Sequence, residues 1–408
     1  MPSPPSKDAP VIIVGAGVFG LSLAYELAAH RGYENITVLD RYMPPVPDGS
    51  SVDVSRIIRS DLERVEKPRL GGALPRSRLH YHEAGFLMLS ARDSRYMKQY
   101  RDAQKPKPPV DVFEAHEVQQ QVKTRYPGVQ ADLKGATAFH NSIGGWAHAR
   151  DAIQGLATRC GLAGVSFVTG ARGTVVALER AGSRIAGVET AAGTRLFCDV
   201  VVLATGAWTS SLVPDDVGLD MLAVGQPVGF IQLSPGEAKR LSAMPVMLKL
   251  ARHGFGYATR VDVGDGRVVS SPKLRENNAA SGYLPDDAEQ ALREGAKSFF
   301  PEFGSRPWAN LRMCWYTDTP TSDFIVDYHP TQEELFFATG GSGHAFKFLL
   351  PVIGTQVADC FERKAAPEIR SKWAARLARV EAEPGMSGDG SRGGPGMRVM
   401  TSKEQARL

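Results

Sequence analysis

The chain has 408 residues, 43% of them hydrophobic and 23% charged, with a formal net charge of +4. This length exceeds the roughly 250–300 residues at which single hydrophobic cores stop growing, so we expect two domains. The interspersed charges disfavour a nucleic-acid partner. We expect neither a membrane partner nor secretion, because no apolar run reaches roughly 18–20 residues and MPSPPSKDAP does not resemble a signal peptide.

The first predicted elements form a β-α-β unit. Val11 to Val14 is an apolar run typical of a buried strand, GAGVFG predicts a turn, and LSLAYELAAH has helical periodicity up to Gly32. ITVLD then predicts a second strand. Parallel sheets covered by helices are built from units of this kind.

The later elements indicate that this sheet is assembled from three separated pieces of the chain. RDAIQGLATRC predicts a helix, VSFVTG a strand, and TVVALE, IAGVET and TRLFCDV an antiparallel segment that leads into the buried strand VVVLATGAW. Near the other end, ELFFATG predicts a buried strand and HAFKFLLPVIGTQVADCF a helix. The segments between these pieces are expected to form a second domain.

A glycine pattern lies between the first predicted strand and helix. Gly15 permits a tight turn, Gly17 lets the backbone approach a pyrophosphate, and Gly20 lets helix and strand pack closely. Asp40 ends the next strand and can accept hydrogen bonds from ribose hydroxyls. The pattern predicts dinucleotide binding, but it does not choose between NAD and FAD.

The four cysteines are Cys160, Cys198, Cys314 and Cys360. They are widely separated and lack the close pair spacings of zinc sites and disulfide scaffolds. We therefore expect reduced thiols and no metal site.

The end of the chain is Gly-rich from about residue 381, so residues 373–408 are expected to form a flexible tail. The last residues, Ala406, Arg407 and Leu408, are a conservative variant of the Ser-Lys-Leu peroxisomal address. Both a peroxisomal and a cytoplasmic location remain open.

Five stretches carry a resemblance to a known family. They are GAGVFG, GSSVDVSRIIR, VVLATGAW, RMCWYTDTP and ATGGSGHAFKFLLPVIG, in this order within residues 11 to 365. Together they resemble the monomeric sarcosine oxidase family of flavoproteins, with its fungal branch of pipecolate, saccharopine and fructosyl amino acid oxidases. The resemblance implies a monomer that uses FAD to oxidise secondary amines or amino acids and returns the electrons to oxygen as hydrogen peroxide.

The resemblance also implies the fold, which is of the α/β class. A Rossmann-type FAD-binding domain would interlock with an α+β substrate domain built on an antiparallel sheet. We expect the FAD-binding domain to comprise residues 1–83, 143–225 and 322–372. The substrate domain would then comprise residues 84–142 and 226–321.

The same resemblance identifies cofactor-binding residues. They are Gly15, Gly17, Val18, Phe19, Gly20, Asp40, Arg41, Ser50, Arg56, Cys314, Gly341, Gly343 and Lys347. Cys314 matches the position at which the family attaches the flavin through a thioether, although a cysteine beside Trp315 would otherwise be interpreted as core packing. Arg56 matches a residue against the flavin, and backbone N–H groups near Gly341 and Gly343 would face the ring.

The catalytic residues implied by the resemblance are Arg59, Lys347, Lys249, His253 and Tyr316. Arg59 and Lys347 match the two halves of a clamp for the substrate carboxylate. Lys249 matches a cation that stabilises the charge formed on oxygen, His253 a residue that orients the amine, and Tyr316 a wall of the substrate cavity. The alternative is that the basic residues belong to solvated surfaces.

Two segments are shorter than the family pattern. ERVEKPRLGGALPRSRL replaces a long helix, and MPVMLKLARH lacks the strand that normally precedes the lysine. Either the pocket is remodelled or the sequence reflects missing coding segments. A flavin-binding protein whose shortened substrate domain no longer turns over is a separate alternative. A nicotinamide-dependent dehydrogenase is a further alternative, which gives Cys314 no role.

The stretch SRIIR contains Arg56 and Arg59, three residues apart. If this stretch is helical, both side chains project from one face of the helix.

Overall fold

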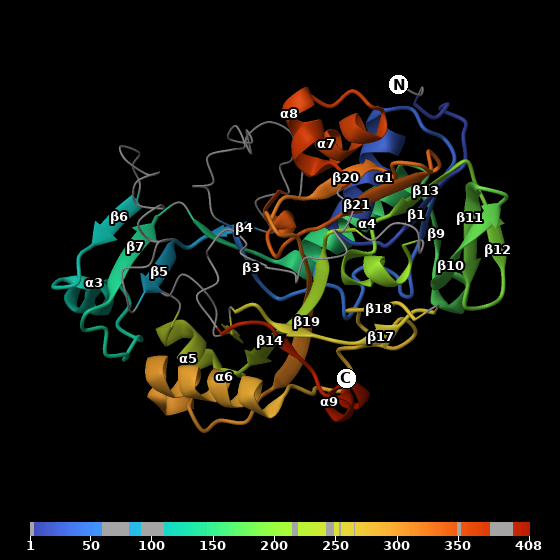
Figure 1. Cartoon of the computed structure of the whole chain (residues 1–408). Helices are drawn as coiled ribbons and strands as arrows, with labels where there is room; N and C mark the ends of the chain where they lie inside the picture. Colours follow the sequence, from blue (N-terminus) through green and yellow to red (C-terminus); the bar gives the residue numbers. More distant parts are fainter. Residues whose placement is uncertain are drawn as a thin grey trace.

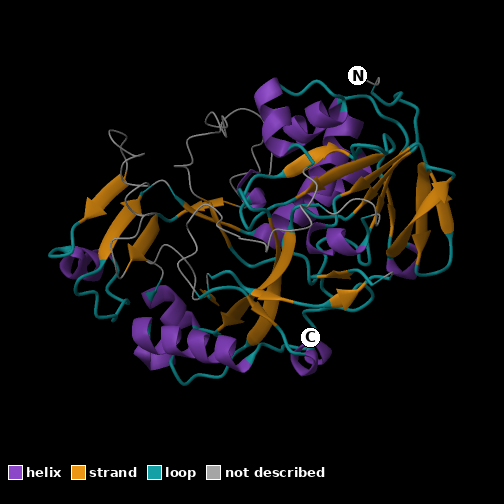
Figure 2. Ribbon diagram, viewed as in Figure 1, coloured by secondary structure: helices purple, strands orange, loops and turns teal. Residues whose placement is uncertain are grey.

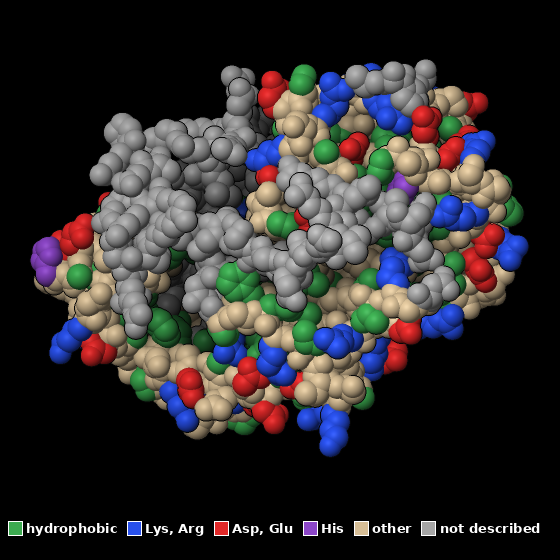
Figure 3. Space-filling model, in the orientation of Figure 1, with side chains coloured by type: hydrophobic (Ala, Val, Ile, Leu, Met, Phe, Trp, Pro, Cys, Tyr) green, Lys and Arg blue, Asp and Glu red, His purple; other side chains and the backbone are tan. Residues whose placement is uncertain are grey.

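The computed structural model describes residues 4–58, 81–90, 110–142, 144–213, 219–241, 249–252, 254–264, 266–348, 352–375 and 395–408. These residues form two neighbouring sheet-based regions, and a small three-stranded sheet projects from one side (Figures 1 and 2). No helix in the described ranges is long and apolar enough to span a membrane. On the face in Figure 3, acidic and basic side chains are interspersed, in agreement with the charge pattern of the sequence.

A six-stranded sheet carries the glycine pattern. Across the sheet, the strands are β20 (Ile325–Tyr328), β21 (Leu335–Thr339), β13 (Val200–Leu203), β1 (Val11–Val14), β2 (Ile36–Leu39) and β9 (Ser166–Val168). Every neighbouring pair is parallel except β20 with β21. Because parallel neighbours need crossover connections, the strands come from separated segments of the chain, as the sequence predicted.

Helices cover one face of this sheet and a second, smaller sheet covers the other. The helices are α1 (Val18–His30), α4 (Ala149–Leu162) and α7 (Val352–Phe361), and the strands are β10 (Val175–Ala181), β11 (Arg184–Thr190) and β12 (Arg195–Phe197). Along β1, Val11 and Ile13 belong to the core beneath the helices, whereas Ile12 and Val14 belong to the core beneath the small sheet. Burial of both faces explains why these strands are continuous apolar runs.

A second large sheet is built around two long strands. These are β14 (Leu222–Phe230) and β19 (Asn310–Asp318), which pair antiparallel over their whole length, while β15 (Lys249–Ala251) and β16 (Tyr257–Ala258) pair with the other edge of β14. Met313 and Trp315 of β19 pack in the core beneath helix α6 (Asp286–Phe299). Because side chains alternate along a strand, Arg312, Cys314 and Tyr316 project from the opposite face.

The remaining elements are short. They are β3 (Arg56–Ile58), β4 (Tyr81–Glu83), β5 (Phe86–Ser90), β6 (Val110–Phe113), α3 (Val118–Arg125), β7 (Thr137–Asn141), β8 (Gly145–Ala147), α5 (Pro235–Arg240), β17 (Val261–Asp262), β18 (Val268–Val269), α8 (Pro367–Trp373), and the 3-10 turns η2 (Gly170–Arg172), η3 (Gly206–Ser211), η4 (Pro301–Phe303) and η5 (Ala345–Phe348). Strands β3, β8 and β4 form a sheet that lies between the projecting sheet of β5, β7 and β6 and the parallel sheet (Figure 1).

The last residues do not form the flexible tail that the composition predicted. Residues 395–408 contain strand β22 (Arg398–Val399), which pairs with β16, and helix α9 (Ser402–Arg407). A capping box between Thr401 and Glu404 fixes the start of α9, and Met400 and Leu408 are buried in the core beneath α6. Apolar anchors and a capped helix thus order this segment. Residues 376–394 lie outside the described part.

The fold class is therefore as predicted, an α/β region beside a domain built on an antiparallel sheet. The residue limits of the two domains remain a prediction, and β14 crosses the expected limit at 225/226. The conditional helix over SRIIR is wrong, because residues 56–58 form strand β3. The single helix expected after ELFFATG is instead the turn η5 followed by α7.

Candidate cofactor-binding site

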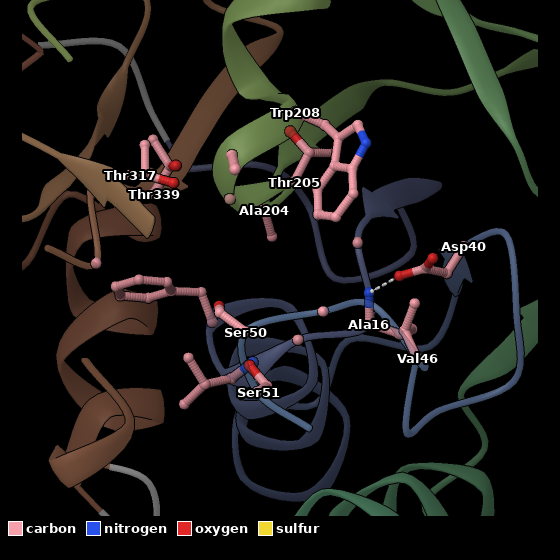
Figure 4. A pocket seen from close by; sticks show the side chains of 18 of the residues that line it. Ala16, Asp40, Val46, Ser50, Ser51, Ala204, Thr205, Trp208, Thr317 and Thr339 are labelled. Atoms are coloured by element: carbon pink, nitrogen blue, oxygen red, sulfur yellow. Dashed lines mark hydrogen bonds between the residues drawn. The ribbon is translucent and has the colours of Figure 1, made fainter. Parts of the chain in front are cut away.

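A cleft opens at the carboxyl ends of the parallel strands β1, β2, β13 and β21. It encloses about 1200 Å³ free of protein atoms, part of it open to solvent. Its walls come from the turn after β1, the segment 46–56, the end of β13 and residues 339–346, which are far apart in the sequence. Crevices at this edge of open α/β sheets are the usual ligand sites of the fold class. Figure 4 shows side chains from these segments facing one another.

The glycines of the pattern are required by close backbone contacts. Gly15 has φ +107°, and an added Cβ there would lie 2.4 Å from the carbonyl oxygen of Ala204. A Cβ at Gly20 would lie 1.9 Å from the carbonyl oxygen of Gly15. Gly17 differs, because the nearest atom to an added Cβ is the Ser51 Oγ at 3.3 Å, so its backbone borders open cleft. These contacts agree with the three roles predicted for the pattern.

Helix α1 directs its first turn toward the cleft. Gly17 precedes the helix without a side-chain cap, and the Val18 N–H donates to Ser51 Oγ at 3.1 Å. A helix N-terminus of this kind favours phosphate oxygens, because its N–H groups lack intrahelical partners. Sequence reasoning missed Ser51, although it lies inside the stretch GSSVDVSRIIR.

Asp40 lies beside this turn at the end of β2. Its carboxylate accepts hydrogen bonds from the N–H group of Ala16 at 2.7 Å (Figure 4) and from that of Arg41, also at 2.7 Å. Burial raises the pKa of Asp40, while the hydrogen bond from Ala16 opposes that rise. The Asp40 carboxylate thus braces the glycine turn and borders the cleft where a ribose would lie.

Arg41 and Trp208 form the wall next to Asp40. Arg41 donates to both carboxylate oxygens of Asp48, at 2.7 and 3.1 Å, and its guanidinium lies 4.4 Å from the Trp208 ring centre. Asp48 is fully buried and also accepts from Asn278. Arg41 is thus held by protein groups at the wall of the cleft. Trp208 was not predicted, although it belongs to the quoted stretch VVLATGAW.

Arg56, Cys314 and Tyr316 meet at the other end of the cleft. Arg56 Nη2 donates to Cys314 Sγ at 3.1 Å, and its buried Nε has no hydrogen-bond partner among the described residues. Arg56 and Tyr316 line the cleft, whereas Cys314 is 1% exposed and lies behind Arg56. A buried N–H donor without a partner is rare in a folded protein. It marks this end of the cleft as a place for a ligand acceptor.

A buried ion cluster lies behind Arg56. The Asp53 carboxylate contacts the Lys249 ammonium, and it lies 3.4 Å from an Arg312 nitrogen and 3.7 Å from an Arg56 nitrogen. Burial alone would raise the pKa of Asp53, but Arg56, Lys249 and Arg312 outweigh it and lower that pKa. Lys249 was predicted here, whereas Asp53 and Arg312 were missed.

The segment after β21 completes the wall opposite α1. Gly341 and Gly343 line the cleft, and an added Cβ at Gly343 would lie 2.5 Å from the Tyr316 ring. Lys347 is half-buried in η5 and does not line the cleft. Arg59 and His253 lie outside the described residues. The structure therefore brings together Lys249, Tyr316 and most of the predicted cofactor residues.

Residues at both ends of this cleft fit FAD. The uncapped start of α1 and the close-packed glycines suit a pyrophosphate, and Asp40 suits a ribose. The unpartnered Arg56 Nε and the glycines 341 and 343 suit the polar edge of a flavin. In the described ranges, no group of three or more His, Cys, Asp or Glu could hold a metal ion.

Comparison with known proteins decides the family. Residues 10–360 match the model of a family described as "FAD dependent oxidoreductase". The chain belongs to this family. FAD dependence and oxidoreductase activity, both predicted from the sequence, are thereby confirmed, and a nicotinamide-dependent dehydrogenase is not supported.

Individual relatives refine this assignment. The chain is 27% identical to L-saccharopine oxidase of Schizosaccharomyces pombe, over 89% of this chain and 92% of the relative. It is 26% identical to human peroxisomal sarcosine oxidase, over 84% and 89%. The solved structure of fructosyl peptide oxidase from E. terrenum has a TM-score of 0.82, with 26% identity and 97% of each chain covered. The resemblance to the sarcosine oxidase family and its fungal branch is confirmed.

Proposed function

We propose that this FAD-dependent oxidoreductase oxidises the C–N bond of a secondary amine or N-substituted amino acid to an imine, with oxygen reduced to hydrogen peroxide. The observation that carries the proposal is the continuous cleft that runs from the α1 turn to Arg56 and Tyr316. Relatives over most of this chain are named saccharopine oxidase and sarcosine oxidase, and structural neighbours are named fructosamine and fructosyl peptide oxidases. All these names denote oxidation of an amine or amino acid.

Cys314 is proposed to carry the flavin as a thioether. The Arg56 guanidinium donates a hydrogen bond to the Cys314 sulfur and so holds it beside the end of the cleft that Arg56 lines. A covalent bond would retain the cofactor and tune its potential. When bound, FAD accepts a hydride equivalent from the substrate and passes the electrons to oxygen.

The substrate is proposed to bind over the Tyr316 end of the cleft. Arg59 and Lys347 would hold its carboxylate, and His253 would orient the amine; the resemblance of the sequence supports these three roles. The Tyr316 ring, packed against Gly343, would form one wall of the pocket. Because two segments of the sequence are shorter than the family pattern, we expect a pocket that differs from those of the relatives.

Lys249 is proposed to supply the positive charge at which oxygen is reduced. It is 13% exposed, and its ammonium is fixed by Asp53 and by the Ser55 carbonyl at 3.1 Å. A preorganised cation stabilises developing negative charge without reorganisation, which is the condition for efficient electrostatic catalysis.

Turnover with amines tests the proposal. The purified holoprotein would be mixed with sarcosine, pipecolate, saccharopine, other N-methyl amino acids and fructosyl amino acids, with oxygen uptake and peroxide measured together. We expect one of these amines to give equal oxygen uptake and peroxide release, both abolished by removing the amine. A flavin-loaded protein that gives no peroxide with any secondary amine or amino acid would contradict the proposed reaction.

Peroxisomal location is proposed on the Ala406-Arg407-Leu408 sequence and on the peroxisomal relatives from human and mouse. Leu408 is buried and its carbonyl oxygen accepts from Lys273 Nζ at 3.0 Å, so receptor binding would require α9 to be released first. Imaging of the chain with an N-terminal fluorescent tag tests this: deletion of the three residues should move the signal from peroxisomes to the cytosol.

A further inference from the structure

Asp53 is the one acidic side chain in the buried cluster beside Cys314, among the described residues. Its side chain is 0% exposed, and those of Arg56, Lys249 and Arg312 are 14%, 13% and 7% exposed. The Val54 N–H donates to its second oxygen at 2.8 Å, which orients the carboxylate toward the three cations. Three cations around one carboxylate leave a local excess of two positive charges.

The cluster joins two parts of the fold. Asp53 and Arg56 come from the segment that leads into β3, whereas Lys249 and Arg312 come from β15 and β19, on either side of β14. In the register of the second sheet, Lys249 faces Phe230 and Arg312 faces Val228, so both lie on the Cys314 face. Arg312 also donates to the Val52 carbonyl at 2.7 Å. Asp53 therefore anchors the cofactor-facing segment to this sheet.

The three cations differ in how they can respond to repulsion. A guanidinium does not lose its proton in proteins, whereas a buried lysine readily does. Burial, followed by the charge of Arg56, lowers the pKa of Lys249, and Asp53 opposes both effects. If the carboxylate were neutral, the repulsion among the cations would be relieved by loss of the Lys249 proton.

We propose that Asp53 is a positioning residue of the reactive centre, whose buried carboxylate gathers Arg56 and Arg312 beside Cys314 and keeps Lys249 in its charged form. The inference deepens the proposed function, on which it rests for the role of Lys249 toward oxygen. Asp53 itself does not line the cleft. Its effect on the reaction passes through Lys249 and Arg56.

Other charged groups near β15 do not provide the same effect. In the part of the chain that the structure describes, the main titratable neighbours on the Lys249 face are Asp53, Arg56, Arg312 and Cys314. Helix α6 packs on the opposite face, against Leu250, and two of its acidic side chains have partners there. There, Asp287 bonds Arg252 and Tyr257, and Glu289 accepts from the Trp308 indole.

The test measures the protonation of Lys249 directly. The full-length holoprotein would be pulse-labelled with acetic anhydride over a range of pH, and the Lys249 peptide quantified by mass spectrometry. Asp53→Asn preserves side-chain size and removes the charge. We expect half-maximal labelling of Lys249 to move to lower pH by at least one unit, a tenfold change in the ratio of ammonium to amine. An unchanged labelling profile would overturn the inference.

Glu362→Gln is the matched control. Glu362 is also a buried carboxylate with three cations, Lys7, Arg31 and Lys364, but it lies at the C-terminal end of α1, where Arg31 is the C-cap, away from the cleft. Its loss should leave the Lys249 labelling profile unchanged, and a shift equal to that of Asp53→Asn would show that the Asp53 effect is merely structural.

If Asp53→Asn does not fold, Arg312→Met carries the test. Removal of the Arg312 charge reduces the repulsion on the Lys249 ammonium, so half-maximal labelling of Lys249 should move to higher pH. No shift, or a shift to lower pH, would refute the inference.

A second measurement links the shift to oxygen. Flavin in the protein would be reduced with dithionite and mixed with oxygen, which requires no amine substrate. The rate of flavin oxidation should fall as the pH rises and Lys249 loses its proton. This fall should occur at a lower pH in Asp53→Asn than in wild type, and Lys249→Met should remove the difference between the two. Lack of turnover with amines would refute only the proposed reaction, because labelling and reoxidation still report on Asp53. A pH dependence that is unaffected by Asp53→Asn would refute the role of Asp53 even in an active enzyme.

Discussion

Replacing Gly20 with Ala should separate the cofactor loop from its helix. The added Cβ would lie 1.9 Å from the Gly15 carbonyl oxygen and 3.2 Å from the Ala204 Cβ. Ordinary Cβ contacts do not fall below 3.0 Å, so two backbone segments must move apart by about 1 Å (3.0 less 1.9). Overpacking of a core costs about 1–3 kcal/mol, and the entropic gain from Gly to Ala returns about 0.5–1 kcal/mol.

The expected net loss is therefore about 1 kcal/mol, concentrated where α1 meets the cleft. Gly295→Ala is the matched control, because Gly295 also lies in a helix and nothing comes within 4 Å of an added Cβ. Thermal midpoints and the ratio of flavin to protein absorbance would be measured for both variants. Gly20→Ala should lower both quantities, and Gly295→Ala should raise the midpoint slightly and leave the ratio unchanged. A Gly20→Ala protein with wild-type midpoint and flavin content would refute the close-contact argument.

Three further outcomes are expected. Cys314→Ala should still bind FAD but release it into the supernatant on acid precipitation; retention in the pellet would mean that another residue is the anchor. Lys249→Met should slow oxidation of the reduced flavin by about 10²–10³-fold, while Lys249→Arg, which keeps the charge, should lose much less; equal rates in stopped-flow mixing would count against its role. Hydrogen bonds from Lys7 and Lys364 outweigh burial and hold the pKa of Glu362 below its usual range. The Glu362 carboxylate thus stabilises the folded protein above the ordinary Glu pKa of about 4.3, and this stabilisation is lost as the pH falls through the folded-state pKa. The melting difference between wild type and Glu362→Gln should shrink below pH about 4; a constant difference would refute this linkage.

The parallel sheet could be predicted because its strands are buried on both faces. Val11 to Val14 and the strand ending at Leu203 are continuous apolar runs, and the Gly15, Gly17 and Gly20 spacing has meaning only between a strand and a helix. The antiparallel β10–β12 segment was equally predictable from its alternation and turn residues. These are local signals, which a single sequence contains in full.

The parts that failed depend on contacts distant in sequence. SRIIR has no strand alternation of its own, and its strand exists because β8 pairs with it. Residues 395–408 are ordered because β22 pairs with β16 and Met400 enters a core built by α6 and β19. Neither partner could be identified from local composition.

The candidate site shows the same division. Cys314, Arg56 and Tyr316 were predicted through the family resemblance, and the structure brings them together at one end of the cleft. Asp53 and Arg312 were missed because each pairs with residues far away in the sequence. Trp208 was missed because an aromatic residue after a strand is usually core, and only the Arg41 contact reveals its place.

The visible absorbance spectrum of the purified protein tests most directly whether this cleft holds FAD and whether Cys314 is its covalent anchor. We expect a flavin spectrum from the protein as isolated and a yellow pellet after acid precipitation. A protein that stays colourless after incubation with FAD would show that the cleft does not hold this cofactor.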